Sequence, residues 1–364
     1  MFNSNGHAHG FENKLLVSNK DSEKAALIGK EQICFLKYPT LTDAKNNYLT
    51  QFPQQLFIEV EESIPLERLR FEEHRHPKKN QCHVQETVSR KTYIENVNAL
   101  KQHIQLGNIY EINYCITFEV FDMEIDPLDM YQKLNSISKA PYSCLAKLDN
   151  QYTISSSPEL FLSKKEHTLT TKPIKGTAKR GLTIEEDNLI KKELYASFKE
   201  RNENVMIVDV ARNDMSRIAK KGSVNVDKLF EIESYQQVHQ MVSTISCELK
   251  NAISFDDIIK ASFPMASMTG APKISAIQLI DEFEKYPRGP YSGTLGYINA
   301  DGNFDLNVLI RSIFYDAEKK YLSFSVGSAI TALCNPEEEY NECLLKAKAM
   351  MEVLEIPNQQ PFIG

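Results

Sequence analysis

The stretch SGTLGYINADGNFDLNVLIRSIF, residues 292–314, alternates apolar and polar side chains on both sides of Asp301-Gly302. An Asp-Gly pair between two alternating segments is a strong signal for a β-hairpin. The apolar run Tyr321 to Val326 predicts a further strand directly after it. We therefore predict antiparallel β-structure in the C-terminal part of the chain.

Helical and strand-like patterns alternate in blocks before and after this hairpin. Helices are predicted where apolar residues recur every three or four positions. The predicted helices are Tyr93 to Leu106, Ile184 to Asp214, one that starts at Pro272, and one that is capped by Asn335 with Glu338 three residues later. Further strands are predicted at Ile109 to Val120, Tyr152 to Leu162 and His167 to Ile174. Helices and antiparallel hairpins in blocks favour an α+β fold.

The first 90 residues give a weaker pattern. Short apolar runs, Ile33 to Leu36 and Leu56 to Val60, indicate strands, and the basic segment His74 to Lys79 indicates a solvated loop. The boundary before a better patterned region falls near Arg90.

Composition excludes several classes of protein. The 364 residues include 42 basic and 49 acidic side chains, a net charge of −7, which argues against sequence-independent binding of nucleic acid. No stretch approaches 18 apolar residues, and the N-terminus lacks the apolar segment of a secretory signal, so we expect a cytoplasmic protein with no membrane association. The seven cysteines are scattered and form no CxxC pair, which indicates reduced thiols.

A cluster of cations marks the first candidate site. The segment TKPIKGTAKRG, residues 171–181, holds the four cations Lys172, Lys175, Lys179 and Arg180 together with two glycines. A lysine among other cations has its pKa lowered, which frees a nucleophilic amine. A basic surface turn is the other interpretation of this segment.

Two Glu-x-x-Glu pairs, Glu200/Glu203 and Glu339/Glu342, lie in predicted helices. Residues three apart share one helix face, so two such helices could offer four carboxylates to Mg²⁺. Ordinary helix-surface charge, with an ion pair from Glu342 to Lys346, explains the same pattern.

Three other features carry less information when each is taken alone. Thr269-Gly270 precedes the Pro272 helix, whose free N–H groups would favour an anion. Arg311 ends the hairpin and could bind a carboxylate or form a salt bridge at a sheet edge. Glu159 follows a short strand as a single carboxylate.

Six segments, in this order, resemble the chorismate-utilising enzymes over roughly Tyr93 to Leu354. They are Gly107-Asn-Ile-Tyr-Glu-Ile-Asn113, Ser156-Ser-Pro-Glu159, Pro173-Ile-Lys-Gly-Thr177, Met206-Ile-Val-Asp-Val-Ala-Arg-Asn-Asp214, Thr269-Gly-Ala-Pro-Lys273 and Glu339-Tyr-Asn-Glu342. The resemblance implies a layered sandwich of antiparallel sheets flanked by helices. It also implies a chorismate-binding catalytic core at residues 91–356, with residues 1–90 as a short N-terminal part of the sheet framework.

With a lysine at position 175, the chain resembles the members of the family that form 4-amino-4-deoxychorismate for para-aminobenzoate and folate synthesis. The resemblance implies that Lys175 attacks C2 of chorismate while the C4 hydroxyl leaves, with Glu159 as acid and base. Ammonia then adds at C4 and expels Lys175. It further implies Mg²⁺ on Glu203 and Glu342, with Glu200 and Glu339 close by. The implied substrate-binding residues are Gly176, Thr177, Thr269, Tyr297, Arg311 and Lys346.

The chain has no Gly-x-Cys-x-Gly turn of a glutaminase, so we expect ammonia from solution or from a separate glutamine amidotransferase subunit. Anthranilate synthesis and a non-catalytic binding subunit with the same fold are the alternatives. The second alternative draws on departures from the family pattern at Gln240, Met265-Ala266 and Ala329.

Overall fold

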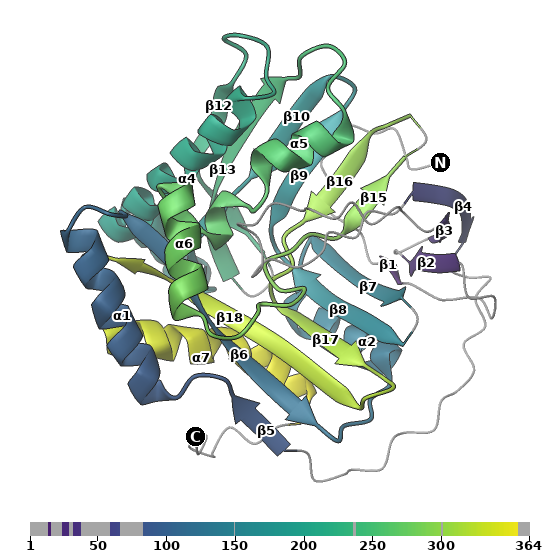
Figure 1. Cartoon of the computed structure of the whole chain (residues 1–364), viewed down its shortest axis with the longest axis horizontal. Coiled ribbons are helices and arrows are strands. Elements are labelled where there is room, and N and C mark those ends of the chain that lie inside the picture. Colours follow the sequence, from purple (N-terminus) through teal and green to yellow (C-terminus); the bar gives the residue numbers. More distant parts are fainter. Residues whose placement is uncertain are drawn as a thin grey trace.

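The computed structural model describes residues 14–15, 24–28, 32–37, 59–65, 83–148, 150–235, 238–299 and 301–355 (Figure 1). The basic segment His74 to Lys79 lies outside these residues, so the loop predicted there has no outcome. No helix of the described part has the length and apolar character needed to cross a bilayer.

Six antiparallel strands form the first sheet, and its centre is the long pair β6–β18. In spatial order they are β5 (His83–Glu86), β6 (Glu111–Phe121), β18 (Tyr321–Thr331), β17 (Ser312–Asp316), β8 (Gln151–Ser157) and β7 (Tyr142–Leu148). The register runs from Leu322 opposite Val120 to Thr331 opposite Glu111. Glu111 therefore lies at the end of the sheet where β6 begins.

The second sheet contains the predicted hairpin. Its strands are, in order, β15 (Gly296–Ile298), β16 (Phe304–Asn307), β9 (Leu160–Lys165), β10 (Thr168–Lys172), β13 (Val238–Glu248) and β12 (Asn225–Ser234). A further strand, β11 (Ile174–Lys179), continues along β13 beyond β10. The hairpin of β15 and β16 is confirmed, with Tyr297 opposite Asp305.

Four N-terminal strands extend this framework. They are β1 (Lys14–Leu15), β2 (Lys24–Ile28), β3 (Gln32–Lys37) and β4 (Glu59–Pro65). β1 and β2 pair with β7, while β4 pairs with β15. The predicted strand Ile33 to Leu36 is confirmed inside β3.

Two predicted strands are wrong in one respect, because each is split between the two sheets. The run from Tyr152 to Leu162 is broken at Pro158, which has no N–H to donate to a strand neighbour. The second arm of the predicted hairpin, from Phe304 to the end of the quoted stretch at Phe314, is broken before Ser312, where Arg311 has a φ of +51°. β8 and β17 pair in the first sheet, whereas β9 and β16 pair in the second.

Helices cover the two sheets separately. α1 (Arg90–Gln105), α2 (Pro127–Ser138) and α7 (Pro336–Val353) pack with the first sheet, α7 against β18 and α2 against β8. α3 (Ile184–Ala196) and α4 (Phe198–Ser216) pack with the second sheet, and α5 (Phe255–Ser262) packs on α4. α6 (Lys273–Phe283) follows β14 (Gly270–Ala271), which pairs with β6 (Figure 1). The predicted α+β fold of layered antiparallel sheets is confirmed.

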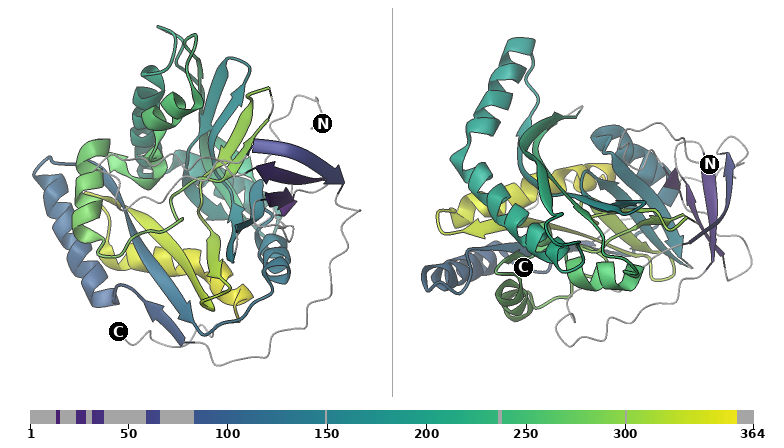
Figure 2. Two further views of the ribbon diagram at one scale, coloured as in Figure 1. Left: turned by 45° about the vertical axis from the view of Figure 1, so that its right-hand side comes forward. Right: turned by 90° about the horizontal axis from the view of Figure 1, so that it is seen from above.

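The long helix predicted from Ile184 to Asp214 is two helices in the structure. Ser197 has an extended backbone, ends α3, and begins α4 by accepting a hydrogen bond from the backbone N–H of Glu200. Serine is well suited to such a cap because its hydroxyl satisfies a free N–H of the first turn. The resulting bend is seen in the right-hand view of Figure 2. It fixes where the first turn of α4, with Glu200 in it, begins.

The caps of the last helix are partly as predicted. Asn335 caps α7 by accepting from the backbone N–H of Glu337, with Pro336 in the first turn. The reciprocal bond expected from Glu338 is absent among the hydrogen bonds of the described residues.

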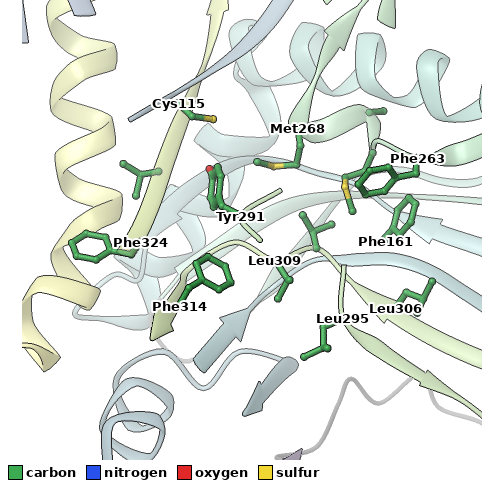
Figure 3. Close-up of a cluster of buried hydrophobic side chains, with 14 of the residues drawn as sticks. Cys115, Phe161, Phe263, Met268, Tyr291, Leu295, Leu306, Leu309, Phe314 and Phe324 are labelled. Atoms are coloured by element: carbon green, nitrogen blue, oxygen red, sulfur yellow. The ribbon is translucent and has the colours of Figure 1, made fainter. Parts of the chain in front are cut away.

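One hydrophobic core joins the sheets. Figure 3 shows side chains from both of them, including Phe161, Leu306, Phe314 and Phe324, around Tyr291. The rings of Phe118 and Phe324 stack at 5.0 Å across the β6–β18 pair. Five cysteines are buried free thiols: Cys115, Cys144, Cys247, Cys334 and Cys343.

Candidate active site

The two points at which strands pass from one sheet to the other lie side by side, and each carries a candidate residue. Glu159 follows β8 and Arg311 precedes β17. The backbone N–H of Val308 donates to the Glu159 carbonyl at 3.0 Å, and that of Ser156 donates to the Arg311 carbonyl at 3.1 Å. Strand pairing on both sides therefore fixes the backbones of these two residues relative to each other.

Glu159 has the environment of a carboxylic acid that keeps its proton. It is 4% exposed, and this burial raises the pKa of its carboxyl to about 7, despite the opposing effect of the Lys175 charge. A carboxyl with a pKa near neutrality can both donate and accept a proton in the physiological range.

Arg311 is a partly buried cation whose guanidinium has no hydrogen bond or ion pair with any side chain among the described residues. Burial lowers its pKa from the ordinary value. Its positive φ directs the chain into β17 immediately afterwards. A guanidinium held in this way is suited to bind a carboxylate in two-pronged fashion.

Lys175 lies among carboxylates. Its side chain is nearly buried, and its Nζ is 2.6 Å from Oε1 of Glu111 at the start of β6. Burial acts to lower the pKa of Lys175, but the charges of Glu111 and Glu203 outweigh it, and the pKa is raised. The ground state of Lys175 is therefore an ammonium ion.

The prediction that neighbouring cations would lower the pKa of Lys175 is wrong. Two of the other cations of this segment are paired elsewhere: Lys172 with Glu233 at 3.3 Å, and Arg180 with Asp187 at 2.7 Å. Successive side chains of a strand point to opposite faces, so neighbours in sequence along β10 and β11 are not neighbours in space.

The two Glu-x-x-Glu pairs come together where α4 meets α7. Glu203 and Glu339 are 5% and 3% exposed, and Lys199 of α4 bridges them. Glu342 pairs with Lys346 at 2.7 Å on α7. Burial, together with repulsion from Glu111 and Glu200, raises the pKa of Glu203 to about 8.

These carboxylates fit a hard divalent cation in their chemistry. Oε1 of Glu203 is buried and accepts no hydrogen bond, and burial, together with the charge of Glu342, raises the pKa of Glu200. A divalent cation takes oxygen ligands of this kind and would remove the repulsion. In the described part of the chain, however, no three acidic, histidine or cysteine side chains are close enough together to hold a metal ion as they stand.

Two of the predicted substrate-binding residues, Gly176 and Lys346, lie close to the carboxylates of α4 and α7. Gly176 follows Lys175 with a φ of +89°, and a Cβ on it would lie 3.0 Å from Oε2 of Glu200, so glycine permits this close approach. Lys346 donates to the carbonyl of Gly327 at 2.8 Å in addition to its pairing with Glu342.

The other three predicted binding residues are less directly connected to Lys175. Thr177 is exposed on β11. Thr269 is buried, with its hydroxyl donating to the carbonyl of Met265 at 3.1 Å. Tyr297 donates to Asp305 across the hairpin and packs against Leu160, next to Glu159.

Two charged residues of the site have no role in the sequence-based prediction. Glu111 is in the quoted segment 107–113, but nothing in its local pattern reveals that it pairs with a lysine 64 positions later. Lys199 precedes Glu203 by four residues, a spacing that predicts an ion pair within a helix. Its contact with Glu339 on α7 is visible only in the fold.

Comparisons with known proteins place this geometry in a family. The family model for chorismate binding enzymes matches residues 10–352. A probable chloroplastic aminodeoxychorismate synthase of Oryza sativa subsp. japonica is 42% identical over 280 residues, which cover 75% of this chain and 31% of that protein. Anthranilate synthase component 1 of Acetivibrio thermocellus is 37% identical over 278 residues, which cover 76% of this chain and 56% of that protein.

Solved structures agree with the sequence relatives. Anthranilate synthase component I of Streptococcus pneumoniae superposes with a TM-score of 0.68 at 28% identity, over 74% of this chain and 60% of that one. This chain spans about a third of the length of the rice relative. The matched residues include both sheets, Glu159, Lys175 and the α4 and α7 carboxylates. On this evidence the chain belongs to the family of chorismate binding enzymes.

Proposed function

We propose that this protein aminates chorismate to 4-amino-4-deoxychorismate with ammonia, in the presence of Mg²⁺. The observation that carries the proposal is the buried lysine Lys175, which lies in a carboxylate-lined site near Glu159. Relatives named aminodeoxychorismate synthase support the same reaction. Other relatives are named anthranilate synthase, and anthranilate formation is the second candidate.

In the proposed reaction, the Lys175 amine forms a bond to C2 of the ring while the bond from C4 to its hydroxyl breaks. Glu159 holds a proton near neutral pH and delivers it to the departing hydroxyl, which leaves as water. Ammonia then bonds to C4, the bond from C2 to Lys175 breaks, and Glu159 takes up the proton that is released.

Lys175 has to lose a proton before it can act as a nucleophile. Glu111 accepts a hydrogen bond from Nζ and has a second oxygen, Oε2, that accepts none, so Glu111 is placed to receive this proton. The charge of Glu203 also raises the pKa of Lys175, so neutralising Glu203 would favour the free amine.

Glu203 and Glu342 would hold Mg²⁺, with Glu200 and Glu339 beside them. The ion, when bound, would supply positive charge for the ring carboxylate of the substrate. Arg311 would bind the enolpyruvyl carboxylate, and Lys346, Gly176, Thr177, Thr269 and Tyr297 would complete the substrate pocket. We further propose that ammonia comes from a separate glutamine amidotransferase subunit and that the protein acts in the cytoplasm.

The test is incubation of the purified chain with chorismate, Mg²⁺ and ammonium chloride, followed by mass analysis of the product. We expect 4-amino-4-deoxychorismate, and no turnover when glutamine replaces ammonium. Formation of anthranilate, identified by its mass and fluorescence, would refute the proposed reaction. The variant Lys175→Ala should lose the reaction, and its thermal unfolding midpoint should fall because Glu111 is left without its buried partner, so activity is compared at a temperature at which both proteins are folded.

A further inference from the structure

Lys199 occupies the junction between the two carboxylate helices. It lies in the first turn of α4, which Ser197 fixes by its cap. Its Nζ is 3.1 Å from Oε1 of Glu339 on α7 and 4.0 Å from Oε1 of Glu203 on its own helix. It is thus the one side chain in the described residues that forms ion pairs with both helices of the proposed metal site.

Lys199 supplies positive charge to the two carboxylates beside it, and Lys175 supplies a further positive charge to Glu203. Glu203 and Glu339 are almost fully buried, and a buried carboxylate without a partner is strongly destabilising. Glu203 Oε1 accepts no hydrogen bond, so the Lys199 charge at 4.0 Å is its nearest compensation on this side. By contrast, Glu342 has its own cation in Lys346.

We propose that Lys199 is a built-in counter-cation that takes the place of the divalent ion in the metal-free protein and leaves when that ion binds. This inference rests on the proposed function in one respect, since both place a divalent cation at these carboxylates. It adds that the site exists in two exclusive states, closed by Lys199 or occupied by metal.

The geometry makes the two states exclusive. Mg²⁺ binds oxygen ligands at about 2.0–2.1 Å. Lys199 forms ion pairs with Oε1 of both Glu203 and Glu339. A divalent ion bound to the same oxygens would lie close to the ammonium group and be repelled by it. The Lys199 side chain is 48% exposed and flexible, so it can turn outward into solvent without any change in α4.

Two consequences can be measured without substrate. Only molecules in which Lys199 has moved away can bind the metal, so the apparent affinity is the intrinsic affinity multiplied by the fraction of such molecules. Removing the ammonium group should therefore tighten binding by about 10-fold or more. The metal-free protein should lose thermal stability at the same time, because Glu203 and Glu339 lose their partner. Added metal should then restore the variant by a larger temperature shift than it gives the parent.

The experiment is a titration of the metal-free full chain with Mn²⁺, followed by electron paramagnetic resonance, and with Mg²⁺, followed by calorimetry. The variants are Lys199→Met and, as a matched control, Lys348→Met, an exposed lysine of α7. We expect a Kd for Mn²⁺ at least about 10-fold lower in Lys199→Met and unchanged in Lys348→Met. Equal or weaker binding by Lys199→Met overturns the inference.

A second variant covers the case in which Lys199→Met does not fold. Lys199→Arg keeps the positive charge and should bind Mn²⁺ no more tightly than the parent. Tighter binding by Lys199→Arg would contradict competition by the side-chain cation. If neither the parent nor any variant binds metal, the metal part of the proposed function fails together with this inference. If the parent and all variants at position 199 bind metal with the same Kd, this inference fails and the proposed metal site remains.

Discussion

The buried acid Glu159 gives the most direct test of how the site is built. We expect Glu159→Gln to stabilise the fold at neutral and alkaline pH while it removes the proposed acid–base group. The amide has nearly the shape of the carboxyl but cannot ionise, so it avoids the cost of a charge at a position that is 4% exposed.

The size and sign follow from the two states of Glu159. Its pKa is about 7 in the folded protein and 4.5, the ordinary value of a glutamic acid, in the unfolded chain. Below pH 4.5 both states hold the proton, and the carboxyl costs nothing. As the pH rises, the unfolded chain ionises first, and folding then has to retain a proton or bury a charge. The cost is about 1 kcal/mol at pH 5 and about 3 kcal/mol at pH 8.

The assay is urea unfolding of the parent and of Glu159→Gln at pH 5, 6, 7 and 8, in chelator and without substrate. Glu352→Gln, which changes an exposed carboxyl on α7, is the control. The advantage of Glu159→Gln should grow with pH, and that of Glu352→Gln should stay near zero. A difference that is constant with pH, or that shrinks toward pH 8, would refute the argument. Chorismate consumption by Glu159→Gln should fall by about 10²- to 10⁴-fold.

Three further predictions concern the surrounding residues. Glu111→Gln and Lys175→Met should each destabilise the fold by about 3–5 kcal/mol, and the double variant by much less than their sum, because each single change leaves a buried charge without its partner. Arg311→Met should raise the KM for chorismate by about 10- to 100-fold, as expected for a lost charged contact of about 1.5–3 kcal/mol, with little change in the thermal midpoint. Gly270→Ala should destabilise the fold by about 1–3 kcal/mol or more, because φ is +154° and a Cβ would lie 2.2 Å from the Glu111 carbonyl oxygen.

Each of these has a clear contrary result. Additive effects of Glu111→Gln and Lys175→Met, measured by urea unfolding, would mean that the two charges are not coupled. An unchanged KM in Arg311→Met, with a fall only in kcat, would remove the binding role of Arg311. For Gly270→Ala the matched control is Gly222→Ala, where a Cβ would meet nothing within 4 Å although φ is also positive. Equal losses in the two variants would assign the effect to φ alone.

Local patterns in the sequence were sufficient for most elements of the fold. The hairpin around Asp301-Gly302 and the cap at Asn335 follow from turn and cap chemistry that acts within a few residues. The break at Ser197 is of the same local kind, but a helical pattern continues across it and hides it. The passage of strands between sheets could not be predicted, because it depends on pairing between segments about 150 residues apart, such as Ser312 with Ser155.

Some features of the candidate site are likewise local in the sequence, and others are not. The carboxylate pairs of α4 and α7 are visible as short motifs, and the family resemblance implies that they bind one metal ion together. The predicted direction of the Lys175 pKa shift is wrong, because Glu111, whose charge raises this pKa, comes from another strand. Sequence neighbours say little about the electrostatics of a side chain on a strand, whose closest charges come from across the sheet or from the helices packed on it.

The separation of the two carboxylate helices along the chain has a consequence for synthesis. Lys199 and its partner Glu339 are 140 residues apart. On a ribosome, Lys175 and the α4 acids are therefore made long before the α7 residues that complete their surroundings. Until α7 docks, Lys199 has no Glu339 to pair with, and the charge arrangement around Glu203 is incomplete. The ion pair that links α4 to α7 can therefore form only when this late helix docks.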